Sequence, residues 1–242
     1  MAASSRRREP SRISAGSLAG ALALTILASV AAPVRADDAM ETKQLVEKAR
    51  LTFESLIAAP EMNGLRDLAK RAKGIFIAPQ ILRGAFIVGV SGGSGVLLAR
   101  GETAGQWGGP AFYTMGEASF GLQAGGDASE LVLLIMTDRG VAALLSSSVK
   151  LGVDASIAAG PVGVGVTAAT ANLSADIISF SRSKGLYGGV SLEGAVVATR
   201  GSWNAAYYGK EVTPTEILIR RTVSNPQATG LIQEVARAGE AR

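Results

Sequence analysis

The chain has 242 residues, 48% of them hydrophobic, and contains neither cysteine nor histidine. Disulfide bonds, Cys/His metal centres, cysteine nucleophiles and Ser-His-Asp catalytic sites are therefore excluded. The formal net charge of +4 comes from one end, because residues 1–36 hold five arginines and one glutamate, whereas residues 37–242 hold 19 basic and 19 acidic side chains. Because residues 37–242 have no net positive charge, nucleic-acid binding is not favoured.

The N-terminal segment has the order of features found in secretory signals. Four arginines within the first 12 residues precede an uncharged run of 15 residues at 18–32. That run is shorter than the roughly 20 residues needed to cross a membrane, and small residues follow at Val34 and Ala36. We predict a signal peptide over 1–36, cleaved near Ala36, and an exported protein of the periplasm or cell envelope. An uncleaved anchor helix is the alternative.

The next segment has helical periodicity. Asp38 and Glu41 have the spacing of a capping box, so we expect the helix to begin at Asp38 and to end before Pro60. Its polar face mixes acidic and basic side chains, which favours packing on the domain over a membrane-surface helix. A second, shorter helix is predicted near 62–72.

From Gly74 onward, short apolar runs separated by Gly, Ser and Pro predict strands. Ser91-Gly92-Gly93-Ser94 is interpreted as a hairpin loop, and Thr137 as the cap of a helix reaching about Leu145. Further helices are expected near 202–208, 213–220 and 226–238. The predicted strands are 74–79, 85–90, 95–100, 111–115, 119–125, 130–136, 150–160, 162–170, 176–182, 185–192 and 195–200.

These elements predict an α+β fold for a single domain over residues 37–242. We expect a largely antiparallel, strongly curved and barrel-like sheet, with the N-terminal and C-terminal helices packed at its ends. Twelve of the 30 glycines lie in the predicted strands. Repeated glycine in strands indicates tight bends or close backbone approach.

One polar cluster stands out in a region with few charges. Ser181, Arg182, Ser183 and Lys184 place two hydroxyls and two cations at a predicted strand turn. Such groups form charge-assisted hydrogen bonds with phosphate, so we predict a lipid-headgroup site there, with the alternative of an exposed solubilising turn. Two other cations, Lys73 and Arg83, are predicted to contribute.

Two further patterns have a weaker link to chemistry. Glycine-rich stretches such as 92–95 lack the Gly-Lys-Ser/Thr ending of a phosphate loop. Asp127 with Glu130, and Asp154 with Asp176, are possible acid/base pairs, although solvated turn carboxylates explain them as well. We predict no catalytic residue, no metal and no cofactor.

Several ordered motifs resemble the SYLF domain family. The resemblance implies a lipid-binding module, since eukaryotic members bind phosphoinositides at membranes and fungal members also bind actin. For an exported chain it implies a generic anionic phospholipid as ligand. The matching stretches are 72–75 with Pro79, 84–89, Trp107 with Pro110, 120–125, 151–156, 160–163, 181–194, Asn204 and 207–209.

The leading hypothesis is thus a non-catalytic exported protein that binds anionic phospholipid at a membrane surface. An integral outer-membrane β-barrel or a structural envelope protein is the alternative. The aromatic content of only 5% argues against the barrel, because it is too low for two aromatic girdles. A carboxylate-based hydrolase is a third possibility without positive support.

Overall fold

The computed structural model describes residues 33–85, 88–101, 106–120, 125–164 and 174–240. The chain divides into two units, Met1–Asp37 and Asp38–Arg242. Most of the predicted signal peptide lies outside the described residues. The second unit contains every strand of the described sheet.

Within the described ranges, nine strands form one sheet, in the order β5-β9-β3-β2-β1-β4-β7-β6 with β8 paired to β7. All pairings are antiparallel except that of β6 with β7. The strands are β1 (Gly74–Ala85), β2 (Val88–Arg100), β3 (Trp107–Phe120), β4 (Gly125–Ile135), β5 (Ser148–Lys150), β6 (Ile157–Ala159), β7 (Ile177–Ser183), β8 (Leu186–Gly188) and β9 (Val196–Thr199).

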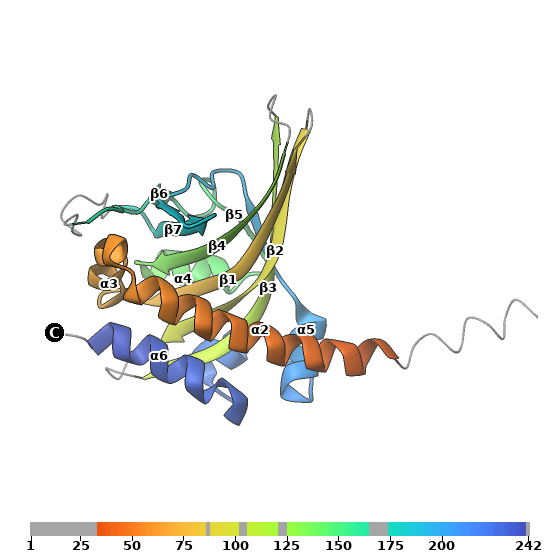
Figure 1. Ribbon diagram of the computed structural model, residues 1–242. Coiled ribbons are helices and arrows are strands. Elements are labelled where there is room, and N and C mark those ends of the chain that lie inside the picture. The colour runs from red at the N-terminus through yellow and green to blue at the C-terminus, as the bar shows by residue number, and fades with distance from the viewer. Residues whose placement is uncertain (1–32, 86–87, 102–105, 121–124, 165–173, 241–242) are drawn as a thin grey trace, which may run out of the picture. The chain divides into compact units, whose positions relative to one another are not determined.

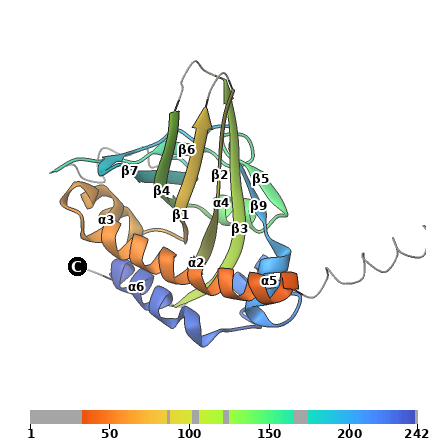
Figure 2. The same cartoon turned by 45° about the vertical axis from the view of Figure 1, so that its right-hand side comes forward.

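Helices cover both faces of this sheet, away from the far tips of the long strands. Figures 1 and 2 show α2 and α6 side by side across one face, while α4 lies on the other. The predicted α+β class, with its curved and largely antiparallel sheet, is confirmed. The helices are α2 (Pro33–Ala58), α3 (Asn63–Ala69), α4 (Asp138–Leu144), α5 (Gly201–Tyr208) and α6 (Thr229–Glu240), with short helical turns at Pro60–Met62, Glu216–Arg220 and Pro226–Ala228.

Strand alternation divides the hydrophobic core between the two faces. Ile75 and Ile77 of β1 pack under α2 and α6, together with Phe53 of α2. Phe76, between them, points to the opposite face and packs beneath Leu144 of α4. Each large apolar side chain buried in this way contributes about 1.5–3 kcal/mol to the free energy of unfolding.

Two glycines of the described chain lie where an aromatic ring packs directly against the backbone. A Cβ on Gly95 would lie 2.4 Å from the ring of Phe76, and one on Gly160 would lie 2.4 Å from the ring of Phe180. The close backbone approach predicted from the glycine content is therefore present.

Local predictions were partly right. Thr137 caps α4, its hydroxyl accepting a hydrogen bond from the Gly140 amide at 3.0 Å. The predicted hairpin loop at 91–94 is wrong, because these residues lie inside β2. Asp38 is not the cap of the first helix, which begins at Pro33; its carboxylate instead accepts a hydrogen bond from the Trp203 indole at 3.1 Å.

Part of the predicted strand at 162–170 lies outside the described residues. None of the helices in the described part of the chain has both the length and the apolar character that a membrane crossing requires.

Candidate functional site

The predicted polar cluster lies at the end of β7, where it is divided between two sides of the sheet. Side chains alternate along a strand, so Ser181 and Ser183 line a cavity in the hollow of the curved sheet. Arg182 and Lys184 line a groove on the side of α2. The six predicted residues therefore do not form one headgroup site.

The cavity of about 120 Å³ is built by strand register. Glu117, Ser91, Arg83 and Asp127 occupy paired positions on the neighbouring strands β3, β2, β1 and β4. Toward the core, the cavity is lined by apolar side chains such as Met115 and Leu131. This row therefore forms the polar mouth of the apolar hollow.

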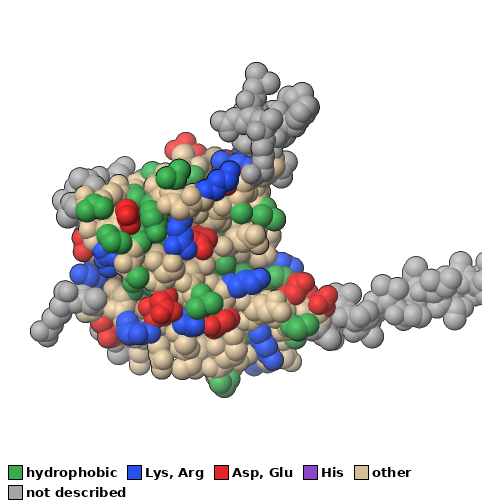
Figure 3. Space-filling model, viewed as in Figure 1, with side chains coloured by type: hydrophobic (Ala, Val, Ile, Leu, Met, Phe, Trp, Pro, Cys, Tyr) green, Lys and Arg blue, Asp and Glu red, His purple; other side chains and the backbone are tan. Residues whose placement is uncertain are grey.

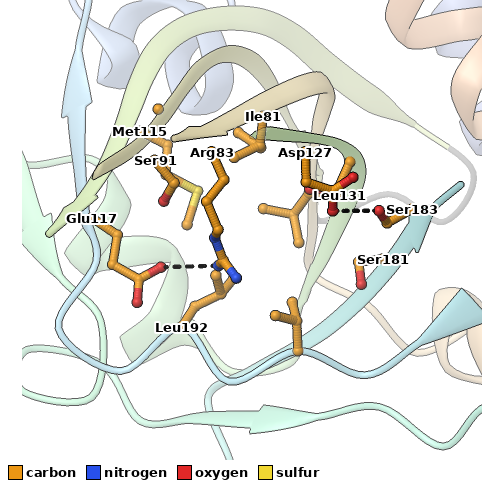
Figure 4. A pocket seen from close by; sticks show the side chains of 13 residues that line it. Ile81, Arg83, Ser91, Met115, Glu117, Asp127, Leu131, Ser181, Ser183 and Leu192 are labelled. Atoms are coloured by element: carbon orange, nitrogen blue, oxygen red, sulfur yellow. Dashed lines mark hydrogen bonds and ion pairs between the residues drawn. The ribbon is translucent and has the colours of Figure 1, made fainter. Parts of the chain in front are cut away.

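Charges of both signs meet in this mouth. Figure 4 shows Arg83 extending into the cavity between Glu117 on one side and Asp127 with Ser183 on the other. Arg83 Nη2 lies 3.7 Å from Glu117 Oε2, and Ser183 donates a hydrogen bond of 2.5 Å to Asp127 Oδ2. This hydrogen bond lowers the pKa of Asp127, and the nearby cations Lys184 and Arg83 lower it further.

The groove of about 620 Å³ lies between α2 and the end of β7. Arg182 is fixed at its base, since Nε donates to Glu130 at 2.5 Å and Nη1 donates to Ser55 of α2 at 2.8 Å. The hydrogen bond to Glu130 raises the pKa of Arg182. Lys48 of α2, which sequence reasoning did not select, lines the opposite side.

The rim of the groove combines an exposed cation with an exposed apolar side chain. The Lys184 side chain is 73% exposed, although its Nζ lies 3.7 Å from Asp127 Oδ1. Leu51 of α2 is 50% exposed in the groove, whereas Leu186, just beyond the turn, is paired with Ser183 and so belongs to the cavity side of the sheet. The turn uses left-handed backbone at Lys184 and Gly185, with φ of 48° and 77°.

Lys73 lies apart from the other predicted residues. It stands beside the first residue of β1 and pairs with Asp138 of α4 at 2.5 Å, in a separate pocket that also contains Arg100 and Arg221. Each of the four predicted cations thus has a carboxylate partner, Glu117 for Arg83, Glu130 for Arg182, Asp127 for Lys184 and Asp138 for Lys73.

The carboxylate pairs considered for catalysis are not joined. Asp127 lines the cavity, whereas Glu130 lines the groove on the other side of β4. Asp176 is buried against Arg139, whereas exposed Asp154 accepts a hydrogen bond from the Lys150 amide at 2.7 Å. Across the described ranges, no group of three or more acidic side chains is arranged to hold a metal ion.

The groove is a local feature of a mixed surface. On the face shown in Figure 3, basic, acidic and hydrophobic side chains are interspersed over the molecule. Among the described residues that line the groove, three are cations (Lys48, Arg182 and Lys184) and one is a carboxylate (Glu130). An anionic group would therefore be favoured in the groove.

Comparison with known proteins identifies relatives of this fold. The Ysc84 family, described as a Las17-binding protein actin regulator, matches residues 116–238. Protein YSC84 of Saccharomyces cerevisiae is 32% identical over 169 residues, which cover 68% of this chain and 36% of that protein. The LAS seventeen-binding protein 3 of the same species is 33% identical over 171 residues, covering 69% and 37%.

A human protein is similar to this chain to about the same degree. The SH3 domain-containing YSC84-like protein 1 is 31% identical over 165 residues, covering 67% of this chain and 48% of that protein. The chain thus spans less than half the length of these relatives. One of them is named as a binding protein, and the description of the family is that of a binding protein and actin regulator. The chain belongs to the Ysc84 family, the family of the SYLF domain that its motifs resemble.

Proposed function

We propose that this protein is a non-catalytic binding protein that attaches peripherally to a membrane surface containing anionic phospholipid. The observation that carries the proposal is the excess of cations in the groove between α2 and β7. Cationic side chains form short, charge-assisted hydrogen bonds with phosphate oxygens. Because residues 37–242 have no net charge, attraction to an anionic surface depends on such a local patch.

The apolar rim supports a membrane rather than a soluble anion as partner. Leu51 exposes a large hydrophobic side chain in the same groove as Lys184. Cations next to exposed apolar residues are the combination that holds a protein at the lipid headgroup boundary. Family membership is consistent with a binding role.

Export is a second part of the proposal and is supported by the sequence of residues 1–36. The test is the mass of the protein recovered from the periplasmic fraction of cells that express the full chain. We expect a mature protein that begins at Asp37. An intact chain recovered with the cytosol would contradict export without affecting lipid binding.

Membrane attachment is tested by flotation with vesicles of phosphatidylglycerol and phosphatidylcholine, compared with phosphatidylcholine alone. The purified protein should float with the anionic vesicles, and the Lys48→Glu/Lys184→Glu variant should lose most of this binding. Lys43→Glu/Lys210→Glu is the matched control, since it changes the net charge equally at exposed positions outside the groove. Equal loss in both variants would show that the groove has no special role.

Protein binding is the second candidate, favoured by the family description of Las17 binding and actin regulation. The matched residues 116–238 include β7 and α6 but not α2, so a function of this segment does not require Lys48. Co-sedimentation with actin filaments tests it. Sedimentation with actin that the single Lys48→Glu variant leaves unchanged would support this candidate, whereas failure of the wild type to sediment would count against it.

A further inference from the structure

The cavity differs from the groove in charge. Among the described residues that line it, Arg83 is opposed by two carboxylates, Glu117 and Asp127. A phosphate alone would meet this negative excess, whereas a cation would be attracted by it. The cavity therefore favours a ligand with a positively charged group, whereas the groove favours an anionic one.

Acceptor groups in the cavity lack donors. Glu117 Oε2 and Asp127 Oδ1 are buried and accept no hydrogen bond, because their ion pairs of 3.7 Å are longer than hydrogen bonds. Ser91 is only 7% exposed and lines the same space, and its hydroxyl makes no hydrogen bond to another described residue. Buried acceptors without donors are unfavourable, so a ligand that supplies N–H donors would be stabilised here.

Size and lining restrict the ligand further. A cavity of about 120 Å³ exceeds several-fold the roughly 30 Å³ that one water occupies in the liquid, but it is smaller than pockets that enclose whole drug-sized molecules. The described residues around it include no aromatic ring. Quaternary ammonium groups are typically held by aromatic cages, so the lining favours a primary ammonium, which donates hydrogen bonds.

Arg83 provides the second half of the ligand's recognition. Its side chain is 46% exposed at the mouth, and among the described residues its one ion-pair partner is Glu117, at the long distance of 3.7 Å. A ligand ammonium that takes the place of the guanidinium beside Glu117 leaves Arg83 able to bind a phosphate at the mouth. With the ammonium on the two carboxylates and the phosphate on Arg83, each charge of the ligand lies beside a side chain of opposite charge.

We propose that this cavity binds a phosphorylated primary amine, with its ammonium on Glu117 and Asp127 and its phosphate on Arg83. The chemistry is that of the ethanolamine phosphate headgroup, which occurs in a membrane phospholipid and as a free compound. The inference deepens the proposed function by naming a headgroup, and it rests on that function only where the source is a lipid.

The cavity is tested with soluble compounds and the full chain, by calorimetry or NMR titration. O-phosphoethanolamine should bind, whereas phosphocholine and inorganic phosphate should bind at least tenfold more weakly. Glu117→Gln removes one charge without changing shape and should weaken O-phosphoethanolamine about tenfold, the effect of losing one hydrogen bond to a charged group. Asp67→Asn is the matched control, because Asp67 pairs equally loosely with Lys70, at 3.8 Å, on the distant helix α3.

Glu117→Gln is informative only if it folds, which circular dichroism establishes. Ser91→Val provides a second route, since it removes a hydroxyl and adds methyl groups to the cavity, and it should weaken O-phosphoethanolamine as well. Equal binding of phosphate and O-phosphoethanolamine, or binding unchanged in both variants, would overturn the proposal.

Vesicles separate the two sources of the headgroup. Adding phosphatidylethanolamine to phosphatidylglycerol vesicles should strengthen flotation of the wild type but not of Glu117→Gln. Binding of the soluble compound without this lipid effect would support the cavity and assign its ligand to the free compound. Wild-type binding that does not depend on phosphatidylglycerol would contradict only the proposal for the groove. The failure of one proposal can therefore be distinguished from the failure of the other.

Discussion

Asp176 shows how one buried carboxylate fastens three elements together. Its oxygens accept hydrogen bonds from Thr137 at 2.6 Å, from Arg139 Nε at 3.1 Å and from the Ser156 amide at 2.9 Å. These partners lie at the start of α4 and ahead of β6, while Asp176 precedes β7. Asp176, considered as an acid/base candidate, is therefore a structural anchor.

Replacing this carboxylate gives a pH-dependent loss of stability. The hydrogen bonds from Arg139, Thr137 and Ser156 lower the pKa of Asp176 far below its ordinary value. Its ionised form therefore stabilises the fold above the unfolded pKa of about 4, and this contribution is lost as the pH falls toward the folded pKa. Asp176→Asn should cost about 2 kcal/mol at pH 7, and the difference from wild type should shrink below pH 4.

Urea unfolding at pH 7 and at pH 3.5 measures this difference. Asp67→Asn, at an exposed ion pair, should change the free energy of unfolding by less than about 0.5 kcal/mol. A cost for Asp176→Asn that is the same at both pH values would show that packing, rather than charge, explains its role.

The residues of the candidate site could be predicted from the sequence only in part. The residue types of 181–184 suggested a single cluster of hydroxyls and cations, but the structure divides these side chains between two surfaces. Their separation into cavity and groove depends on β7 continuing through Ser183, whereas the sequence suggested a turn. Lys48 could not be selected, because its relation to Arg182 exists only once α2 is packed beside the end of β7.

At the scale of elements, the glycines in the central strands set the distance between side chains and backbone. Gly95 of β2 lies where a Cβ would approach the Phe76 ring at 2.4 Å and the Ile77 carbonyl oxygen at 2.8 Å. Gly95→Ala should therefore lower the free energy of unfolding by about 1–3 kcal/mol through overpacking. Gly116→Ala on β3 is the control, since the nearest atom to its Cβ would be 3.8 Å away.

Thermal and urea unfolding of the two variants compare these sites. Both substitutions place the same residue in neighbouring strands, so β propensity affects them alike. Equal destabilisation would mean that strand propensity, not the contact with Phe76, governs these positions.

The glycines also explain why the hairpin prediction failed. Ser91–Ser94 has the composition of a turn, yet a Cβ on Gly93 would lie 2.2 Å from the Gln80 carbonyl oxygen of β1. Glycine serves here to let strands approach at the irregularity between Ile77 and Gln80. Apolar runs predict the strands well, but composition alone does not distinguish a turn from a tightly packed strand.

For the whole molecule, the balance of charges determines how membrane binding should respond to salt. The groove carries a local positive excess on a body with equal numbers of acidic and basic residues. At 0.1 M salt, charges are screened beyond about 10 Å. Flotation with anionic vesicles should thus fall steadily between about 0.05 and 0.5 M NaCl, while Lys43→Glu/Lys210→Glu follows the wild-type curve.

Binding that is insensitive to salt would indicate that the apolar contact of Leu51 dominates over the cations. The fold class at this scale was predictable, because strand texture and helical periodicity persist over long segments. The placement of α2 and α6 across one face was not, since it depends on which strand faces are apolar after the register is set.

The alternation along β7 has a consequence for how the protein tolerates change in length. One extra residue between Phe180 and Ser181 would turn the two serines outward and bring Arg182 and Lys184 into the hollow. Residues added after Lys184 would leave both sides intact. Insertions should therefore be accepted between Lys184 and Leu186 but not within the strand, where a shift of one residue exchanges the side chains that line the cavity with those that line the groove.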